Sequence, residues 1–129
     1  MRVMPDTNVL TSAALFPDSK FASALIQAMQ EHTVVVCTYT IEELHEVFDR
    51  KFSDKVGHLN AFMSKLSYEL CSTPEITDKT PAMRDEDDRP ILQAAIDADV
   101  DIVLTGDKDF HVLGLVRPRI LAPSEFFNA

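Results

Sequence analysis

Short β-branched runs alternate with helical patterns along the whole chain. The clearest run, Thr33–Cys37, contains three consecutive valines, which is typical of a strand covered on both faces. The other predicted strands are Arg2–Met4, Asp101–Leu104 and Arg119–Leu121. Strands that alternate with helices predict an α/β fold with a central parallel sheet, helices on both of its faces and right-handed crossovers.

Apolar residues at helical spacing predict the helices between these strands. One stripe consists of Phe21, Leu25, Ile26 and Met29, and Ser19 is suited to cap that helix at its start. Further helices are predicted from about Ile41 to Phe52, from about Lys55 to Leu70 and from Asp88 through Ala98, with a closing helical turn from Pro123 to Phe127. The prolines between Ser72 and Pro81 predict a loop there.

Length and composition predict one globular domain spanning residues 1–129. No apolar stretch approaches the roughly 18–20 residues that span a bilayer. Met1-Arg2 leads directly into a predicted strand, so we expect a cytoplasmic protein without a signal peptide. Cys37 and Cys71 are expected to be buried thiols, because their spacing matches no zinc site. The net charge of −9 argues against tight, sequence-indifferent binding of nucleic acid and suits a weak, transient substrate or a basic protein partner.

Four acidic residues fall where a parallel α/β fold gathers side chains at one edge of its sheet. Asp6 and Asp107 each follow a predicted strand, whereas Glu43 and Asp88 lie near predicted helix starts. Strand ends and the starts of the following helices share the edge where ligands bind. Whether the four side chains converge depends on strand order, which their spacing leaves open. Crowded carboxylates are costly unless a cation lies among them, so we expect a metal-dependent enzyme acting on a phosphodiester.

Each acidic residue also has a purely structural interpretation. Asp6 and Asp107 could be turn residues, and Asp88 could be only a helix N-cap. Thr40-x-x-Glu43 matches a capping box, although Glu43 lies nearer the apolar stripe of its helix than the neighbouring glutamates do. All four structural interpretations would have to hold at one edge of one sheet, which favours a shared site.

Four segments carry a resemblance to a known family. They are Asp6-Thr7-Asn8-Val9-Leu10, Glu42 to Phe48 with Glu43 at the acidic position, Asp87 to Leu92 with Asp88 at the acidic position and Ala94-Ala95 following, and Asp101 to Phe110. In this order they resemble the motifs of PIN-domain nucleases, which include the VapC-type toxins of bacterial toxin–antitoxin pairs. The resemblance covers nearly the whole chain, and its last segment is the most specific.

The resemblance implies a three-layer α/β/α domain that cleaves single-stranded RNA with Mg²⁺ or Mn²⁺. It also implies a homodimer and, for a toxin, a small antitoxin that occludes the site. The catalytic and metal-binding residues would be Asp6, Glu43, Asp88 and Asp107. Asn8 and Thr105 would orient carboxylates or water from behind these residues.

Several positions close to the motifs need separate interpretation. Asp109 is either an accessory acid or a solvated turn residue, and Asp85 and Asp87 are interpreted as loop charges. Pro5 departs from the family, which usually has an aliphatic residue there. Because proline has no N–H to donate to a neighbouring strand, the first strand is expected to end by Met4 or to contain a bulge.

Three other functions remain as alternatives. A phosphatase with a nucleophilic aspartate on the first strand would commonly carry a second Asp two positions later, where this chain has Asn8. A receiver-like signalling domain would need a phospho-accepting Asp and a late Lys opposite it, and the sequence contains no convincing pair. A non-catalytic PIN-like module could bind RNA or protein, but it would have no reason to keep four costly carboxylates together.

Overall fold

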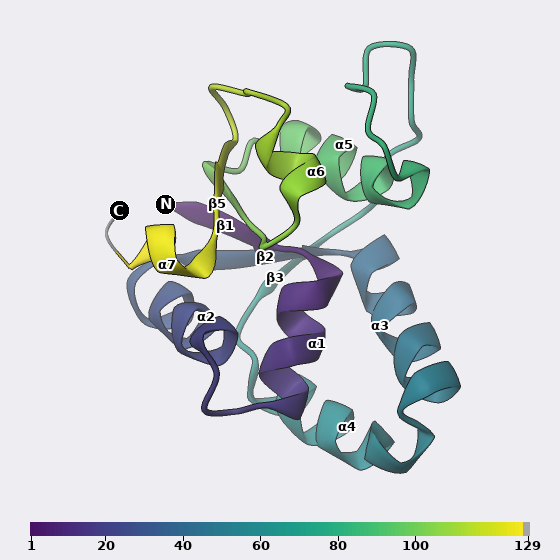
Figure 1. Ribbon diagram of the computed structural model, residues 1–129, viewed down its shortest axis with the longest axis vertical. Coiled ribbons are helices and arrows are strands. Elements are labelled where there is room, and N and C mark those ends of the chain that lie inside the picture. Colours follow the sequence, from purple (N-terminus) through teal and green to yellow (C-terminus); the bar gives the residue numbers. More distant parts are fainter. Residues whose placement is uncertain (128–129) are drawn as a thin grey trace.

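Among residues 1–127, which the computed structural model describes, five parallel strands form one sheet. In spatial order they are β3 (Glu69–Cys71), β2 (Thr33–Cys37), β1 (Arg2–Pro5), β4 (Ile102–Leu104) and β5 (Arg119–Leu121). Figure 1 shows helices on both sides of this sheet. The three-layer α/β/α sandwich expected from the sequence is confirmed.

The helices divide into a large and a small layer. The large layer contains α1 (Thr7–Leu15), α2 (Lys20–Glu31), α3 (Thr38–Lys51), α4 (Val56–Lys65) and α7 (Pro123–Phe126), and the small layer contains α5 (Arg89–Asp97) and α6 (Lys108–His111). Val34 and Val36 of β2 pack with the large layer, whereas Val35 and Cys37 pack with the small one. The valine run is therefore covered on both faces, as predicted.

The predicted helix from about Lys55 to Leu70 is too long. A short 3₁₀ turn precedes α4, which ends at Lys65, and the last residues of the predicted helix belong to β3. β3 pairs with β2 in register, with Leu70 opposite Val36. Pairing with β2 therefore overrides the helical spacing of Leu66 and Leu70, because tertiary contacts outweigh weak local preferences.

Two helices, α1 and α6, have no counterpart among the predictions. Each has an aspartate as its N-cap: Asp6, directly after β1, for α1, and Asp107, three residues after the end of β4, for α6. The structural alternative considered for both aspartates in the sequence was a turn, and the structure shows helix N-caps instead. Val9 and Ala13 are buried on one side of α1, so a helical stripe was present but short.

α3 begins at Thr38, three residues before the predicted start. The capping-box alternative for Thr40 and Glu43 is therefore wrong, because both residues lie inside the helix. The Thr40 hydroxyl is buried and lies 3.2 Å from the Cys37 sulfur. Glu43 is consequently free of a capping role and lies in the second turn of the helix, facing the carboxyl edge of the sheet.

The prediction that β1 ends by Met4 or contains a bulge is also wrong. β1 includes Pro5, which lies opposite Leu104 of β4. The next N–H, that of Asp6, donates to the Leu104 carbonyl over 3.1 Å, so the Pro5 nitrogen faces the β2 side instead. Pairing with β2 ends at Val3, and the missing proline donor therefore leaves the β1–β4 ladder intact.

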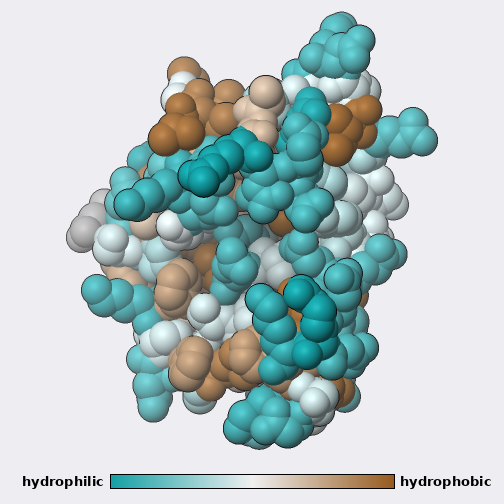
Figure 2. All heavy atoms as spheres, turned by 45° about the vertical axis from the view of Figure 1, so that its right-hand side comes forward, coloured by the Kyte–Doolittle hydropathy of each residue, from teal (hydrophilic) through white to brown (hydrophobic). Residues whose placement is uncertain are grey.

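The outer surface is mostly polar on the face shown in Figure 2, where apolar side chains form separate patches. Within residues 1–127, no helix combines the length and the apolar composition that crossing a bilayer requires.

Candidate metal centre

Asp6 is held by hydrogen bonds to both of its carboxylate oxygens. Its Oδ1 accepts from the Val9 N–H over 2.8 Å, and its Oδ2 accepts from the Thr105 hydroxyl. Only 3% of the residue is exposed. Burial raises the pKa of the Asp6 carboxyl to about 6, against the effect of both hydrogen bonds, and the charges of Asp107 and Glu43 raise it further. A buried acid is thus fixed at the junction of β1 and α1.

Glu43 reaches the same edge of the sheet from α3. The Thr7 hydroxyl, one residue after Asp6, donates to Glu43 Oε1 and so ties α1 to α3. Burial is the main cause that raises the pKa of the Glu43 carboxyl, and the charges of Asp87 and Asp85 act in the same direction.

Asp88 lies at the end of a 3₁₀ turn, Glu86–Asp88, and at the N-cap position of α5, but its side chain makes no capping hydrogen bond. Among residues 1–127, its Oδ2 is the buried side-chain nitrogen or oxygen atom that has no hydrogen-bond partner. Burial raises the pKa of the Asp88 carboxyl to about 7, and the charges of Asp107, Asp85 and Asp6 contribute. The N-cap interpretation therefore does not account for this side chain.

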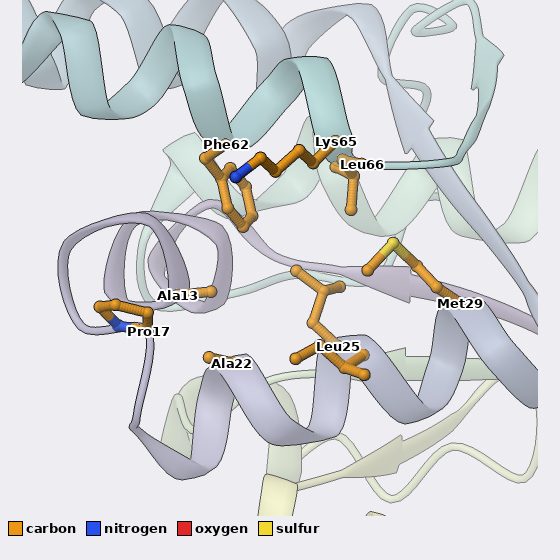
Figure 3. A pocket seen from close by; sticks show the side chains of 9 residues that line it. Ala13, Pro17, Ala22, Leu25, Met29, Phe62, Lys65 and Leu66 are labelled. Carbon is orange, nitrogen blue, oxygen red and sulfur yellow. The ribbon is translucent and has the colours of Figure 1, made fainter.

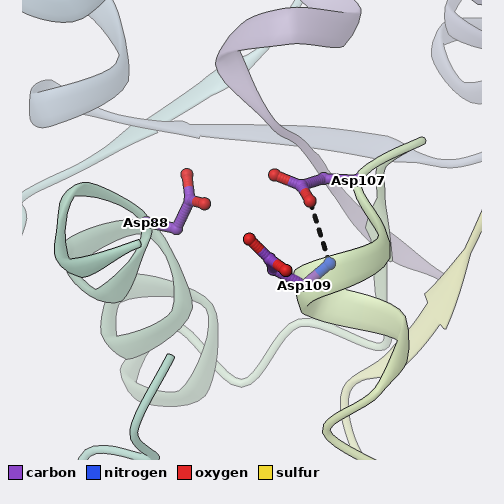
Figure 4. Close-up of side chains that lie close together, drawn as sticks. All are labelled: Asp88, Asp107 and Asp109. Carbon is purple, nitrogen blue, oxygen red and sulfur yellow. Dashed lines mark hydrogen bonds between the residues drawn. The ribbon is translucent and has the colours of Figure 1, made fainter. Parts of the chain in front are cut away.

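Asp107 and Asp109 face Asp88 from the start of α6. The Asp107 Oδ1 accepts from the Asp109 N–H over 2.9 Å, and the Asp107 N–H donates to the Thr105 hydroxyl over 3.0 Å. One carboxylate oxygen from each of Asp88, Asp107 and Asp109 lies within 4.8 Å of the other two (Figure 4). Asp109 therefore lies with its neighbouring acids, at a spacing that one small cation could bridge.

The remaining acidic residues line a small cleft that adjoins this triad. The cleft has a volume of about 140 Å³, and its polar lining includes Asp6, Asn8, Glu43, Asp85, Asp87 and Asp88. Asp88 belongs to both the triad and the cleft. The four acids singled out in the sequence thus meet at one edge, although Asp6 and Glu43 lie outside the tightest group.

Sequence reasoning missed part of this arrangement. Asp85 and Asp87, interpreted as loop charges, line the cleft, and Thr7 holds Glu43. A run of acids directly before a helix start was the available signal for the first two. The Thr7 contact joins residues 36 positions apart and depends on how α1 packs against α3.

A second hollow, of about 230 Å³, lies between α2 and α4 and has an almost wholly apolar lining. Figure 3 shows Leu25 and Met29 on one side and Phe62 and Leu66 on the other. The charged residue in this lining is Lys65, and no carboxylate is present there. The hollow therefore offers mainly apolar contact and no carboxylate that could hold a metal ion.

The fold and the site together define a parallel α/β/α domain with an acidic centre at the carboxyl edge of its sheet. The PIN domain family matches residues 2–109, and the chain belongs to this family. The resemblance noted in the sequence is thereby confirmed. No curated protein matches the sequence.

A solved structure with a similar fold is the crystal structure of VapBC2 from Rickettsia felis, which is bound to a DNA fragment from its own promoter. The match covers 95% of this chain and 98% of that chain, with a TM-score of 0.73 and 15% sequence identity. At this identity the match supports the fold of nearly the whole chain.

Proposed function

We propose that this chain is a Mg²⁺- or Mn²⁺-dependent endoribonuclease that cleaves phosphodiester bonds of single-stranded RNA. We further propose that it is the toxin of a toxin–antitoxin pair. The observation that carries the proposal is the partnerless buried oxygen of Asp88, which faces two more carboxylates and adjoins a cleft lined with others.

The residues present fit a hard divalent cation. The donors are carboxylate oxygens, which Mg²⁺ and Mn²⁺ prefer, and no histidine or cysteine lines the cleft. Among the described residues, no Lys or Arg forms an ion pair with Asp6, Glu43, Asp88, Asp107 or Asp109. The protein therefore leaves the negative charge of this site to be balanced by a ligand.

Asp6, Glu43, Asp88 and Asp107 would hold the cation, and Asp109 would join them from α6. A bound cation supplies a water of lowered pKa and positive charge for the phosphate oxygens. The Thr105 hydroxyl donates a hydrogen bond to Asp6 and accepts one from the Asp107 N–H, so one buried hydroxyl positions two acids. Thr7 orients Glu43 in the same way. Asn8 is exposed at the cleft, where its amide can contact the substrate or a water.

The proposed partners follow from the charge and from the structural comparison. The similar fold of VapBC2 supports an antitoxin partner, and the acidic cleft together with the net charge of −9 favours a basic antitoxin segment that covers the site. The same charge favours weak, transient contact with RNA, through bound cations. A homodimer in the cytoplasm completes the proposal.

Metal-dependent cleavage of a mixed RNA pool, with the cut sites mapped, tests this function. We expect cleavage with Mg²⁺ or Mn²⁺, none with EDTA, and a loss of roughly 1000-fold in Asp6→Asn, since metal catalysis contributes several kcal/mol. The Asn side chain keeps an acceptor for the Val9 N–H, so the fold is retained.

Asp101→Asn, the same change at the opposite end of the sheet, is the matched control and should cleave like the natural sequence. Unchanged cleavage in Asp6→Asn would refute the assignment. Absence of both metal binding and cleavage in the natural sequence would favour a non-catalytic module that binds RNA or protein.

A further inference from the structure

We infer that Cys37 and Cys71 are a redox-active thiol pair that forms a disulfide between β2 and β3 when the protein meets a small-molecule disulfide. The inference is independent of the proposed nuclease function, because it concerns the packing of two strands.

The register of the sheet places the two thiols side by side. Cys37 lies directly opposite Cys71 in the parallel β2–β3 pair. Neighbouring strands are about 4.8 Å apart, which lies within the roughly 4.4–6.8 Å that separates the Cα atoms of disulfide-bonded cysteines. Both side chains pack with the core beneath α5, so they point to the same face of the sheet. Both cysteines are free.

The two thiols differ in accessibility, which gives them different roles. Cys37 is fully buried, whereas Cys71 is partly exposed at the end of the edge strand β3. An external disulfide can therefore reach Cys71 but not Cys37. The neighbouring residues Glu69 and Leu70 are exposed, so solvent reaches the edge strand β3 near Cys71. Cys71 is therefore the thiol that reacts first with the external disulfide, and Cys37 is the thiol that then displaces the attached group from Cys71.

The reaction is two thiol–disulfide exchanges with a disulfide such as oxidised glutathione. The Cys71 thiolate attacks one sulfur of that disulfide, whose S–S bond breaks and releases one glutathione thiolate. The Cys37 thiolate then attacks the Cys71 sulfur and releases the second. Two protein thiols are oxidised, one glutathione disulfide is reduced to two thiols, and the two protons lost from the cysteines end on the released thiols.

The local environment sets the pace of the first exchange. Burial raises the pKa of the Cys71 thiol, and the neighbouring Cys37 acts in the same direction. Little thiolate is present at neutral pH, so the reaction should be slow there and faster in mildly alkaline solution.

The disulfide would close a loop that contains α3 and α4 and would fasten the edge strand to the sheet. Cross-linking a loop of this size restricts the unfolded chain, so the melting temperature should rise by roughly 5–10 °C. Cys37 is also the N-cap residue of α3, the helix that carries Glu43.

The test is incubation of the full chain with oxidised glutathione at mildly alkaline pH, followed by intact-mass measurement and non-reducing peptide mapping. We expect a monomer lighter by two hydrogen atoms, a peptide joining Cys37 to Cys71, and a raised melting temperature that reducing agent reverses. Cys71→Ser should stay unmodified, because its remaining thiol is buried.

Cys37→Ala should instead retain a glutathione adduct on Cys71, with folding checked by circular dichroism. A natural chain that stays reduced, keeps the adduct on Cys71, or cross-links to a second copy through Cys71 would overturn the inference. The result for the natural chain is decisive even if Cys37→Ala does not fold.

Discussion

The two ends of the parallel sheet treat their carboxylates in opposite ways. At the amino end, Asp101 accepts from the Arg2 N–H over 2.7 Å and pairs with Arg117 over 3.0 Å. Glu69 pairs with the Arg2 guanidinium over 2.6 Å. These contacts lower the pKa of both acids, chiefly through the Arg2 N–H for Asp101 and the Arg2 side chain for Glu69. At the carboxyl end, the pKa values of Asp6 and Asp88 are raised instead.

The contrast separates acids that are paired with arginines from acids that form no ion pair with a protein cation in the described part of the chain. Asp101 precedes and Asp107 follows the same strand, β4, so the two aspartates lie at its opposite ends. Their protein partners differ as well. Arginines form ion pairs at the amino end, whereas within residues 1–127 no Lys or Arg forms an ion pair at the acidic centre. Keeping unbalanced carboxylates together destabilises the metal-free fold, and such a cost is expected at functional sites.

The largest effect should follow removal of one acid from the carboxyl end. Asp88→Asn takes away the charge of the partnerless carboxylate, and we expect cleavage to fall by at least about 100-fold, with little loss of fold. Added Mn²⁺ should raise the melting temperature of the natural chain and not that of Asp88→Asn. Similar activity and metal-induced stabilisation in both proteins would remove the distinction between the two ends of the sheet.

An intermediate effect concerns the pH dependence of stability in EDTA. Asp6 and Asp88 have pKa values of about 6 and about 7 in the fold, against an ordinary value of 3.8. The folded protein binds these protons more tightly than the unfolded chain, so their stabilising contribution is complete below about pH 3.8 and is lost as the pH rises to about 7. For buried Asp6 alone, the contribution is on the order of 3 kcal/mol.

Urea unfolding between pH 4.5 and pH 8 measures this decline. Asp6→Asn should remove the part of the decline in unfolding free energy that Asp6 causes. Saturating Mg²⁺ should restore the stability of the natural chain at the alkaline end of this pH range. At the amino end of the sheet, the pH dependence of stability has the opposite sign. Asp101 and Glu69 stabilise the fold above their ordinary pKa values, and this contribution is lost as the pH falls through their lowered ones. Stability of the metal-free chain that rises steadily from pH 4.5 to 8 would contradict the raised pKa values of Asp6 and Asp88.

The smallest effect should come from Asp101→Asn. Asn still accepts from the Arg2 N–H but loses the charge that pairs with Arg117, and exposed ion pairs contribute little. We expect a slightly lower urea midpoint at neutral pH and an unchanged response to divalent cations. A response to Mn²⁺ that weakens as much as in Asp88→Asn would show that the two ends are not independent.

Much of the arrangement could be predicted because strand ends and helix starts are fixed by connectivity. Asp6 and Asp107 follow strands recognised from their apolar runs, so both were expected at the carboxyl edge. The strand order β3-β2-β1-β4-β5 could not be obtained this way. That order places β1 beside β4 and so brings Asp6 to the Thr105 hydroxyl, a contact between residues 99 positions apart.

The remaining errors occur in short elements with little signal of their own. β3 has three residues at an edge, and its conformation comes from pairing with β2 rather than from its sequence. α6 has four residues, so no periodicity identifies it, and the sequence could not decide whether Asp109 was an accessory acid or a solvated turn residue. The prediction that β1 ends before Pro5 failed for a related reason, since the effect of a proline depends on which neighbouring strand its nitrogen faces.

Titration calorimetry of Mn²⁺ into the natural chain and Asp88→Asn at neutral pH, in two buffers of different ionisation enthalpy, tests the shared-cation interpretation most directly. A cation held by Asp88 and its neighbours must displace protons that the raised pKa values keep on them. We therefore expect the natural chain to bind Mn²⁺ with release of protons, and Asp88→Asn to lose this binding. Equal, proton-free binding in both proteins, or none in either, would contradict a metal centre at this edge of the sheet.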